Sequence, residues 1–157
     1  MFGRGPRSGD CLARFARTSL PLQCHREIGV PKAPLVAIVD DCESIRETTK
    51  DLLESAGFSA AVFAGATSLL KSKRLNQVSC LIADMRMPKM TGLELYQHLV
   101  ASYRPIPTIL MTAYPDERTR AQAIKANVIC YLTKPFAADH LLACVRRALQ
   151  SHDTGGE

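Results

Sequence analysis

The 157-residue sequence lacks several features that would each point to a particular class of protein. No run approaches the ~20 consecutive apolar residues of a membrane-spanning helix, so no membrane association is expected. None of the six cysteines forms a C-x-x-C pair or lies at zinc-ligand spacing from a histidine, which argues against a structural zinc site. The cysteines are expected to be reduced and mostly buried, as in a cytoplasmic protein.

The net charge of +5 is unevenly placed. Residues 1–33 carry six basic and two acidic residues, whereas the remainder carries 14 basic and 13 acidic residues. The nearly neutral remainder does not indicate a nucleic-acid-binding surface, and direct DNA binding is not expected. We predict that residues 1–33 are a basic, disordered extension. A transit peptide and a start codon assigned too far upstream remain alternatives for this segment.

Residues 34–150 alternate between short apolar runs and helical patterns, and their length fits one domain. The predicted strands cover residues 35–39, 58–63, 78–83, 106–111 and 128–133. The predicted helices cover residues 43–55, 67–74, 92–103, 116–126 and 138–150. Five strand–helix units predict an α/β fold, with a mostly parallel sheet covered by helices on both faces. Residues 151–157 are predicted to be a short flexible tail.

Polar side chains collect where four of the five predicted strands end. Asp40 and Asp41 follow the first strand, Asp84 the third, Thr112 the fourth and Lys134 the fifth. Ligands of open α/β sheets bind outside the carboxyl ends of the strands. Because neighbouring strands lie ~4.8 Å apart, these side chains are expected to converge on one small volume.

The chemistry of this set favours phosphoryl transfer. Three carboxylates held together repel one another unless a hard cation such as Mg²⁺ lies between them. Asp84, on the most central of these strands, is the best placed nucleophile, and a carboxylate that attacks a phosphoryl group forms an acyl phosphate. The Lys134 ammonium and the Thr112 hydroxyl would then neutralise and position the transferred group.

From residue 34 to residue 150 the chain resembles the receiver domain of two-component response regulators. The matching motifs are Val-Asp-Asp at 39–41, Ile-Ala-Asp-Met-Arg-Met-Pro at 82–88, Gly-Leu-Glu-Leu at 92–95, Met-Thr-Ala at 111–113 and Lys-Pro-Phe at 134–136. Each motif is weak alone, but five in this order are specific. The similarity is greatest to receivers that often precede a LuxR-type DNA-binding domain, which is not recognised in these 157 residues.

The resemblance implies a flavodoxin-like fold, with the five strands in the order 2-1-3-4-5. It also implies that Asp84 is the phosphoacceptor and that a sensor histidine kinase or a histidine phosphotransfer protein supplies the phosphoryl group. Mg²⁺ would be held by Asp40, Asp41, Asp84 and the backbone carbonyl of Arg86. The chain would be a signalling module and not an enzyme.

The remaining implied roles concern switching. Thr112 and Tyr131 would move inward on phosphorylation, and the Lys134–Pro135 peptide bond would be cis. The signal would leave through an unknown output protein that binds the face formed by helix 116–126, strand 128–133 and helix 138–150. A monomer and a phosphorylation-dependent homodimer both fit this expectation.

Three alternatives stay open at this point. The chain could be a constitutive protein-binding module that no longer switches. It could be a Mg²⁺-dependent phosphatase, although Arg86 stands where such enzymes carry a second aspartate. Asp40 and Asp41 could, taken alone, simply cap the following helix.

Overall fold

A computed structural model describes residues 33–102 and 104–154 of the chain. The prediction for the basic extension therefore falls, apart from its last residue, outside the described residues. The strands are β1 Leu35–Val39, β2 Ser59–Phe63, β3 Val78–Asp84, β4 Thr108–Thr112 and β5 Cys130–Thr133. The helices are α2 Glu43–Ser55, α3 Ala66–Leu70, the 3₁₀ helix η1 Lys73–Gln77, α4 Gly92–Ala101, α5 Glu117–Lys125 and α6 Ala138–Thr154.

The strands form one parallel sheet in the order β2-β1-β3-β4-β5. This confirms the predicted fold class and strand order. The order places β1, β3 and β4 next to one another at the centre of the sheet, so the residues that follow them meet at its carboxyl edge. Within the described part of the chain, no helix has the length and apolar character needed to cross a membrane.

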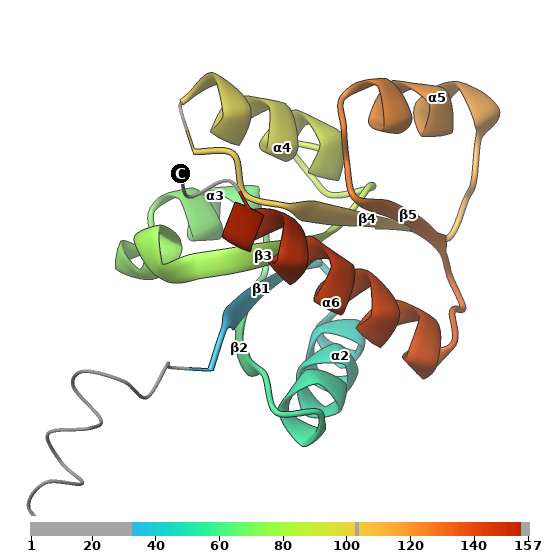
Figure 1. Cartoon of the computed structure of the whole chain (residues 1–157). Coiled ribbons are helices and arrows are strands. Elements are labelled where there is room, and N and C mark those ends of the chain that lie inside the picture. The colour runs from blue at the N-terminus through green and yellow to red at the C-terminus, as the bar shows by residue number, and fades with distance from the viewer. Residues whose placement is uncertain (1–32, 103, 155–157) are drawn as a thin grey trace, which may run out of the picture. The chain divides into compact units, whose positions relative to one another are not determined.

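Helices cover both faces of the sheet, as Figure 1 shows. On one face, α2 and α6 pack through residues such as Leu53 and Leu141 against Ile38 and Ile82 of the central strands. On the other face, α3, α4 and α5 pack against alternate residues of the same strands. All five residues of β1 and of β4 are buried, as expected for strands covered on both sides.

Several element boundaries differ from the prediction because of local hydrogen bonds. The helix predicted over residues 67–74 ends at Leu70, and Ser72 then begins η1 by accepting a hydrogen bond from the Arg74 N–H. The fourth strand begins at Thr108, directly after Pro107, which has no N–H to donate to a ladder. The last helix continues to Thr154, four residues beyond the predicted end, so the first part of the predicted flexible tail is helical.

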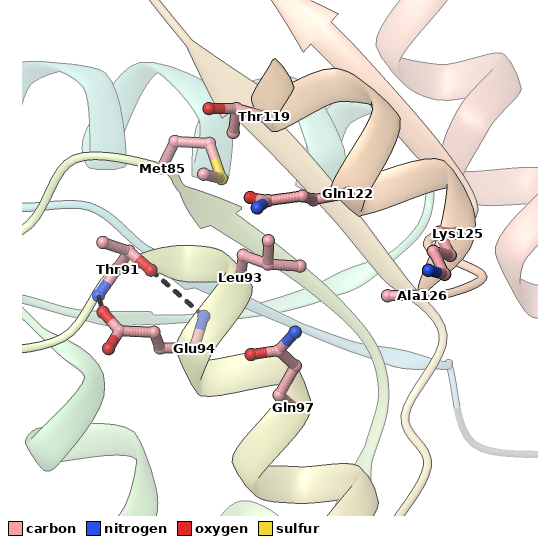
Figure 2. A pocket seen from close by; sticks show the side chains of 9 residues that line it. All are labelled: Met85, Thr91, Leu93, Glu94, Gln97, Thr119, Gln122, Lys125 and Ala126. Carbon is pink, nitrogen blue, oxygen red and sulfur yellow. Dashed lines mark hydrogen bonds between the residues drawn. The ribbon is translucent and has the colours of Figure 1, made fainter. Parts of the chain in front are cut away.

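A capping box that the sequence analysis did not identify fixes the start of α4. The Thr91 hydroxyl accepts a hydrogen bond from the Glu94 N–H at 3.1 Å, and the Glu94 carboxylate accepts one from the Thr91 N–H at 2.9 Å. Figure 2 shows both bonds. The Thr-x-x-Glu spacing at residues 91–94 was a visible signal for this arrangement.

We expect Thr91→Ala to lower the free energy of unfolding by about 1 kcal/mol, because α4 loses its side-chain N-cap. Urea denaturation would measure the change. Thr48→Ala is a matched control, since Thr48 is exposed within α2 and alanine is the better helix former there. Equal stabilities of the two variants would contradict a stabilising role for the capping box.

Candidate functional site

Three carboxylates meet at the carboxyl edge of the sheet. Asp40 and Asp41 follow β1, and Asp84 is the last residue of β3. One carboxylate oxygen from each lies within 4.8 Å of those of the other two. Asp40 and Asp84 are buried, whereas Asp41 is exposed, so the cluster opens to solvent on one side.

Lys134 places its ammonium group between two of these acids. Its Nζ lies 2.9 Å from Asp40 Oδ2 and 3.2 Å from Asp84 Oδ1. Lys134 follows β5, the edge strand, and its backbone N–H donates to the Thr112 carbonyl at the end of β4. The Lys134–Pro135 peptide bond is cis. The structure thus brings together the carboxylates and the lysine that the strand ends were predicted to supply.

Burial and the charges of neighbouring groups shift the pKa values of Asp84 and Lys134. Burial raises the pKa of Asp84, the charge of Asp40 raises it further, and Lys134 partly offsets both. Burial by itself would lower the pKa of Lys134, but the hydrogen bonds and charges of Asp40 and Asp84 together outweigh it and raise that pKa. The Lys134 ammonium therefore stays protonated, and its positive charge offsets the repulsion between the carboxylates.

Backbone and side-chain contacts orient Asp40. Its Oδ1 accepts a hydrogen bond from the Cys42 N–H at 2.8 Å, and its carbonyl accepts one from the Arg46 guanidinium at 2.7 Å. Cys42, and neither aspartate, is the N-cap residue of α2, and its side chain makes no capping hydrogen bond. The interpretation of Asp40 and Asp41 as simple helix caps is therefore wrong.

Thr112 and Tyr131, the two predicted switch residues, are neighbours in the structure. The Thr112 hydroxyl is buried and accepts a hydrogen bond from the Tyr114 N–H at 3.0 Å. Burial raises the pKa of Tyr131, the charge of Asp116 acts in the same direction, and a hydrogen bond with the Thr112 side chain opposes them. The two predicted switch residues thus lie on adjacent strands, Thr112 at the end of β4 and Tyr131 within β5.

The loop after Asp84 depends on two residues whose roles the sequence did not reveal. A Cβ added to Gly92 would lie 2.6 Å from the Asp84 carbonyl oxygen, so only glycine permits this close approach of α4. The left-handed position in the loop is Lys89, with φ 74°. Glycine is required at residue 92 because α4 packs closely against Asp84.

The donor set suits a hard divalent cation. Three carboxylates supply oxygen ligands, and the Arg86 carbonyl accepts no hydrogen bond from the described residues, so it is available as a further oxygen. The Arg86 side chain is directed elsewhere: its guanidinium lies over the Tyr114 ring, 4.6 Å from the ring centroid. This position therefore offers the site a backbone oxygen and no second carboxylate.

A groove of about 560 Å³ lies between α4 and α5, close to the site. Met85, which directly follows Asp84, lines it together with Leu93 of α4 and Gln122 of α5 (Figure 2). Met85 also donates its N–H to the Met111 carbonyl of β4. Met85 thus bonds to β4 through its backbone and lines the groove between α4 and α5.

Comparisons with known proteins agree with this geometry. A family model described as the response regulator receiver domain matches residues 36–146. The C4-dicarboxylate transport transcriptional regulatory protein DctD of Rhizobium meliloti is 38% identical over 116 residues, which cover 74% of this chain and 25% of that protein. Response regulator protein TodT of Pseudomonas putida is 34% identical over 119 residues, covering 76% of this chain and 52% of that protein.

A solved structure of the response regulator StyR superposes with a TM-score of 0.72 at 40% identity, covering 78% of this chain and 62% of that one. The chain spans between a quarter and about half of the length of the two curated relatives above. The match lies in the part of the chain that holds the sheet, the acids and the lysine. On this evidence, the chain belongs to the response regulator receiver domain family.

Proposed function

We propose that this protein is a phosphoacceptor of a two-component phosphorelay, with Asp84 as the residue that is phosphorylated. The observation that carries the proposal is the cluster of three carboxylates with the Lys134 ammonium 3.2 Å from Asp84. Asp84 supplies an oxygen nucleophile whose side chain is 10% exposed, and Lys134 supplies a positive charge next to it. Receiver domains are signalling modules, and this chain is proposed to act as one.

The transfer is a displacement at phosphorus. A carboxylate oxygen of Asp84 forms the new P–O bond, and the bond from phosphorus to the donor breaks, leaving its electron pair on the donor. Mg²⁺ held by Asp40, Asp41, Asp84 and the Arg86 carbonyl would supply charge neutralisation to the phosphoryl oxygens. Lys134, directly after β5, contacts the transferred group, and the Thr112 hydroxyl at the end of β4 binds it after transfer.

The proposed response is a shift of a two-state equilibrium at the end of the sheet. Thr112 moves toward the phosphoryl group, and Tyr131, on the adjacent strand β5, follows. Tyr131 lies on β5 between α5 and α6, so its movement repacks the face formed by α5, β5 and α6. This face, which is the output face predicted from the sequence, would bind an output protein or a second copy of the chain.

The proposal also includes the protein that donates the phosphoryl group and the cellular compartment of the transfer. A sensor histidine kinase or a histidine phosphotransfer protein supplies the phosphoryl group, and the cytoplasm expected from the sequence is where the transfer takes place. The names of DctD, TodT and StyR mark those proteins as regulators. Their similarity to this chain supports a regulatory role for it.

Intact-mass spectrometry after incubation with acetyl phosphate and Mg²⁺ tests the proposal. The natural protein is expected to gain a single phosphoryl group, and chelation of Mg²⁺ is expected to prevent the gain. Asp84→Asn should show no adduct, whereas Asp51→Asn, at an exposed aspartate of α2, should react like the natural protein. A folded natural protein that stays unmodified would overturn the proposal and favour a constitutive binding module.

The phosphatase alternative has little support from the geometry. A phosphatase needs an acid or base near the nucleophile to turn over the acyl phosphate. At the corresponding position Arg86 contributes a guanidinium that stacks on Tyr114. We therefore expect the phosphoryl group on Asp84 to be a signal and not an intermediate of rapid turnover.

A further inference from the structure

A hollow of about 280 Å³ lies on the proposed output face, and residues of α5, β5 and α6 line it. β5 is the last strand of the sheet, and α5 and α6 cover opposite faces of that sheet (Figure 1). Most small-molecule sites have volumes of ~300–1,000 Å³. The hollow is smaller, so its size suits a single side chain of a protein partner.

The exposed part of the lining is basic. Arg120 of α5 and both His140 and Arg147 of α6 line the hollow, whereas no described aspartate or glutamate does. Both arginines are exposed, and the ion pairs within the described part of the chain are those of Lys134. The two guanidinium groups therefore have no carboxylate partner within residues 33–102 and 104–154.

The rest of the lining is mostly apolar. Ile124 is 62% exposed, which is unusual for a large hydrophobic side chain in this structure, and it stands one helical turn after Arg120. Leu132 and Cys144, which are buried, also line the hollow. An apolar side chain that enters the hollow would thus cover exposed apolar surface, and the residues beside it would face the arginines.

We propose that this hollow binds an acidic segment of a partner protein, in which carboxylates flank one large apolar side chain. The apolar side chain packs against Ile124, and the carboxylates pair with Arg120 and Arg147. The inference rests on the function proposed above and deepens it, because it states the chemistry of the partner that the output face binds.

Two other occupants fit the charges less well. A second copy related by a twofold axis through the hollow would place the same basic patch against itself, because such an interface is self-complementary. A long polyanion such as a nucleic acid would also meet Glu117 and Asp139, which lie in the first turns of the same two helices. A short acidic segment avoids both conflicts.

Tyr131 connects the hollow to the proposed switch. It lines the hollow, and its strand pairs with the strand that ends in Thr112. An inward movement of Tyr131 on phosphorylation therefore changes the shape of the hollow and gives the apolar side chain more room. We expect the affinity for the acidic segment to rise on phosphorylation of Asp84.

Selection from a random dodecapeptide phage library, with the folded natural protein as bait, tests the chemistry of the partner. The test variant combines Arg120→Glu with Arg147→Glu. The matched control combines Arg118→Glu with Arg146→Glu, at exposed positions of the same helices that do not line the hollow. The two variants change the net charge equally, so they separate the hollow from the general electrostatic field of the protein.

We expect the selected peptides to be rich in aspartate and glutamate around one leucine, isoleucine or phenylalanine. Fluorescence anisotropy of the labelled peptides should show an affinity about tenfold lower for the test variant than for the control, because two ion pairs become repulsive. Ile124→Ala should also weaken binding. Val100→Ala, at an exposed position of α4 outside the hollow, should not.

Peptides without acidic enrichment, equal losses of affinity in the two double variants, or the absence of any selectable peptide would overturn the inference. A dimer of the natural protein that only the test variant abolishes in sedimentation analysis would also overturn it, because the hollow would then hold a second copy.

The same peptides separate this inference from the phosphoacceptor function. Acetyl phosphate with Mg²⁺ should raise the affinity of the natural protein and leave that of Asp84→Asn unchanged. Both double variants should still gain the phosphoryl group, since none of the four arginines belongs to the acid cluster. Acidic peptides that bind the hollow of a protein that forms no adduct would refute the phosphoacceptor function and support the inferred partner chemistry.

Discussion

Replacement of Lys134 by methionine is expected to lower the free energy of unfolding of the metal-free protein by about 3 kcal/mol, near the lower end for breaking a buried ion pair. The variant keeps the aliphatic stem and removes the charge that lies 2.9 Å from Asp40 and 3.2 Å from Asp84. Asp40 is fully buried and would be left facing Asp84 without a compensating cation. The Lys134 side chain is 17% exposed, which keeps the effect from being larger.

Mg²⁺ should stabilise Lys134→Met more than it stabilises the natural protein, because the ion replaces the missing positive charge among the carboxylates. Urea denaturation with Mg²⁺ and with a chelator measures both effects. Lys125→Met, at an exposed position of α5, is the matched control and should change stability little. Lys134→Met is also expected not to gain a phosphoryl group from acetyl phosphate. A stability equal to that of the control would contradict a structural role for the ion pairs.

Gly92→Ala is expected to destabilise the protein by about 1–3 kcal/mol, although glycine-to-alanine changes in helices are usually stabilising. The added Cβ would lie 2.6 Å from the Asp84 carbonyl oxygen and 3.0 Å from a Leu110 methyl carbon. Both neighbours belong to central strands and cannot move aside easily. The clash therefore pushes α4 away from the end of β3 and displaces the loop between them, which carries the Arg86 carbonyl.

Urea denaturation together with the acetyl-phosphate assay measures both consequences of Gly92→Ala. We expect unfolding at a lower midpoint concentration of urea and slower formation of the phosphoryl adduct on Asp84. Gly65→Ala is the control, because a Cβ there would meet no atom within 4 Å. A stability of Gly92→Ala above that of the natural protein would show that the contact with Asp84 is not a steric constraint.

The fold was predictable because its signals are local and repeat along the chain. Continuous apolar runs such as residues 35–39 mark strands buried on both faces, and each is followed by a helical pattern. Gly57 and Asn127 follow two helices and adopt φ of 96° and 69°, the left-handed conformation that is common after a helix and that glycine and asparagine tolerate. Boundaries were less accurate, since single hydrogen bonds such as that from Arg74 to Ser72 decide them.

The members of the site were also readable from the sequence. Each of Asp40, Asp84, Thr112 and Lys134 stands at or just past the end of a predicted strand, and parallel strands deliver their ends to one edge. The contacts among them were not readable. Lys134 pairs with Asp40 across 94 residues, and only the sheet order and register decide which carboxylate the ammonium reaches.

The sequence by itself thus determined the alternation of strands and helices, the parallel sheet and the set of residues at its edge, because periodicity and strand ends are properties of short segments. Tertiary structure alone decided the ion pairs of Lys134 and the need for glycine at residue 92. Each of these depends on distances between segments that are remote in the chain. Such distances are set by how helices pack on the sheet, which no local pattern encodes.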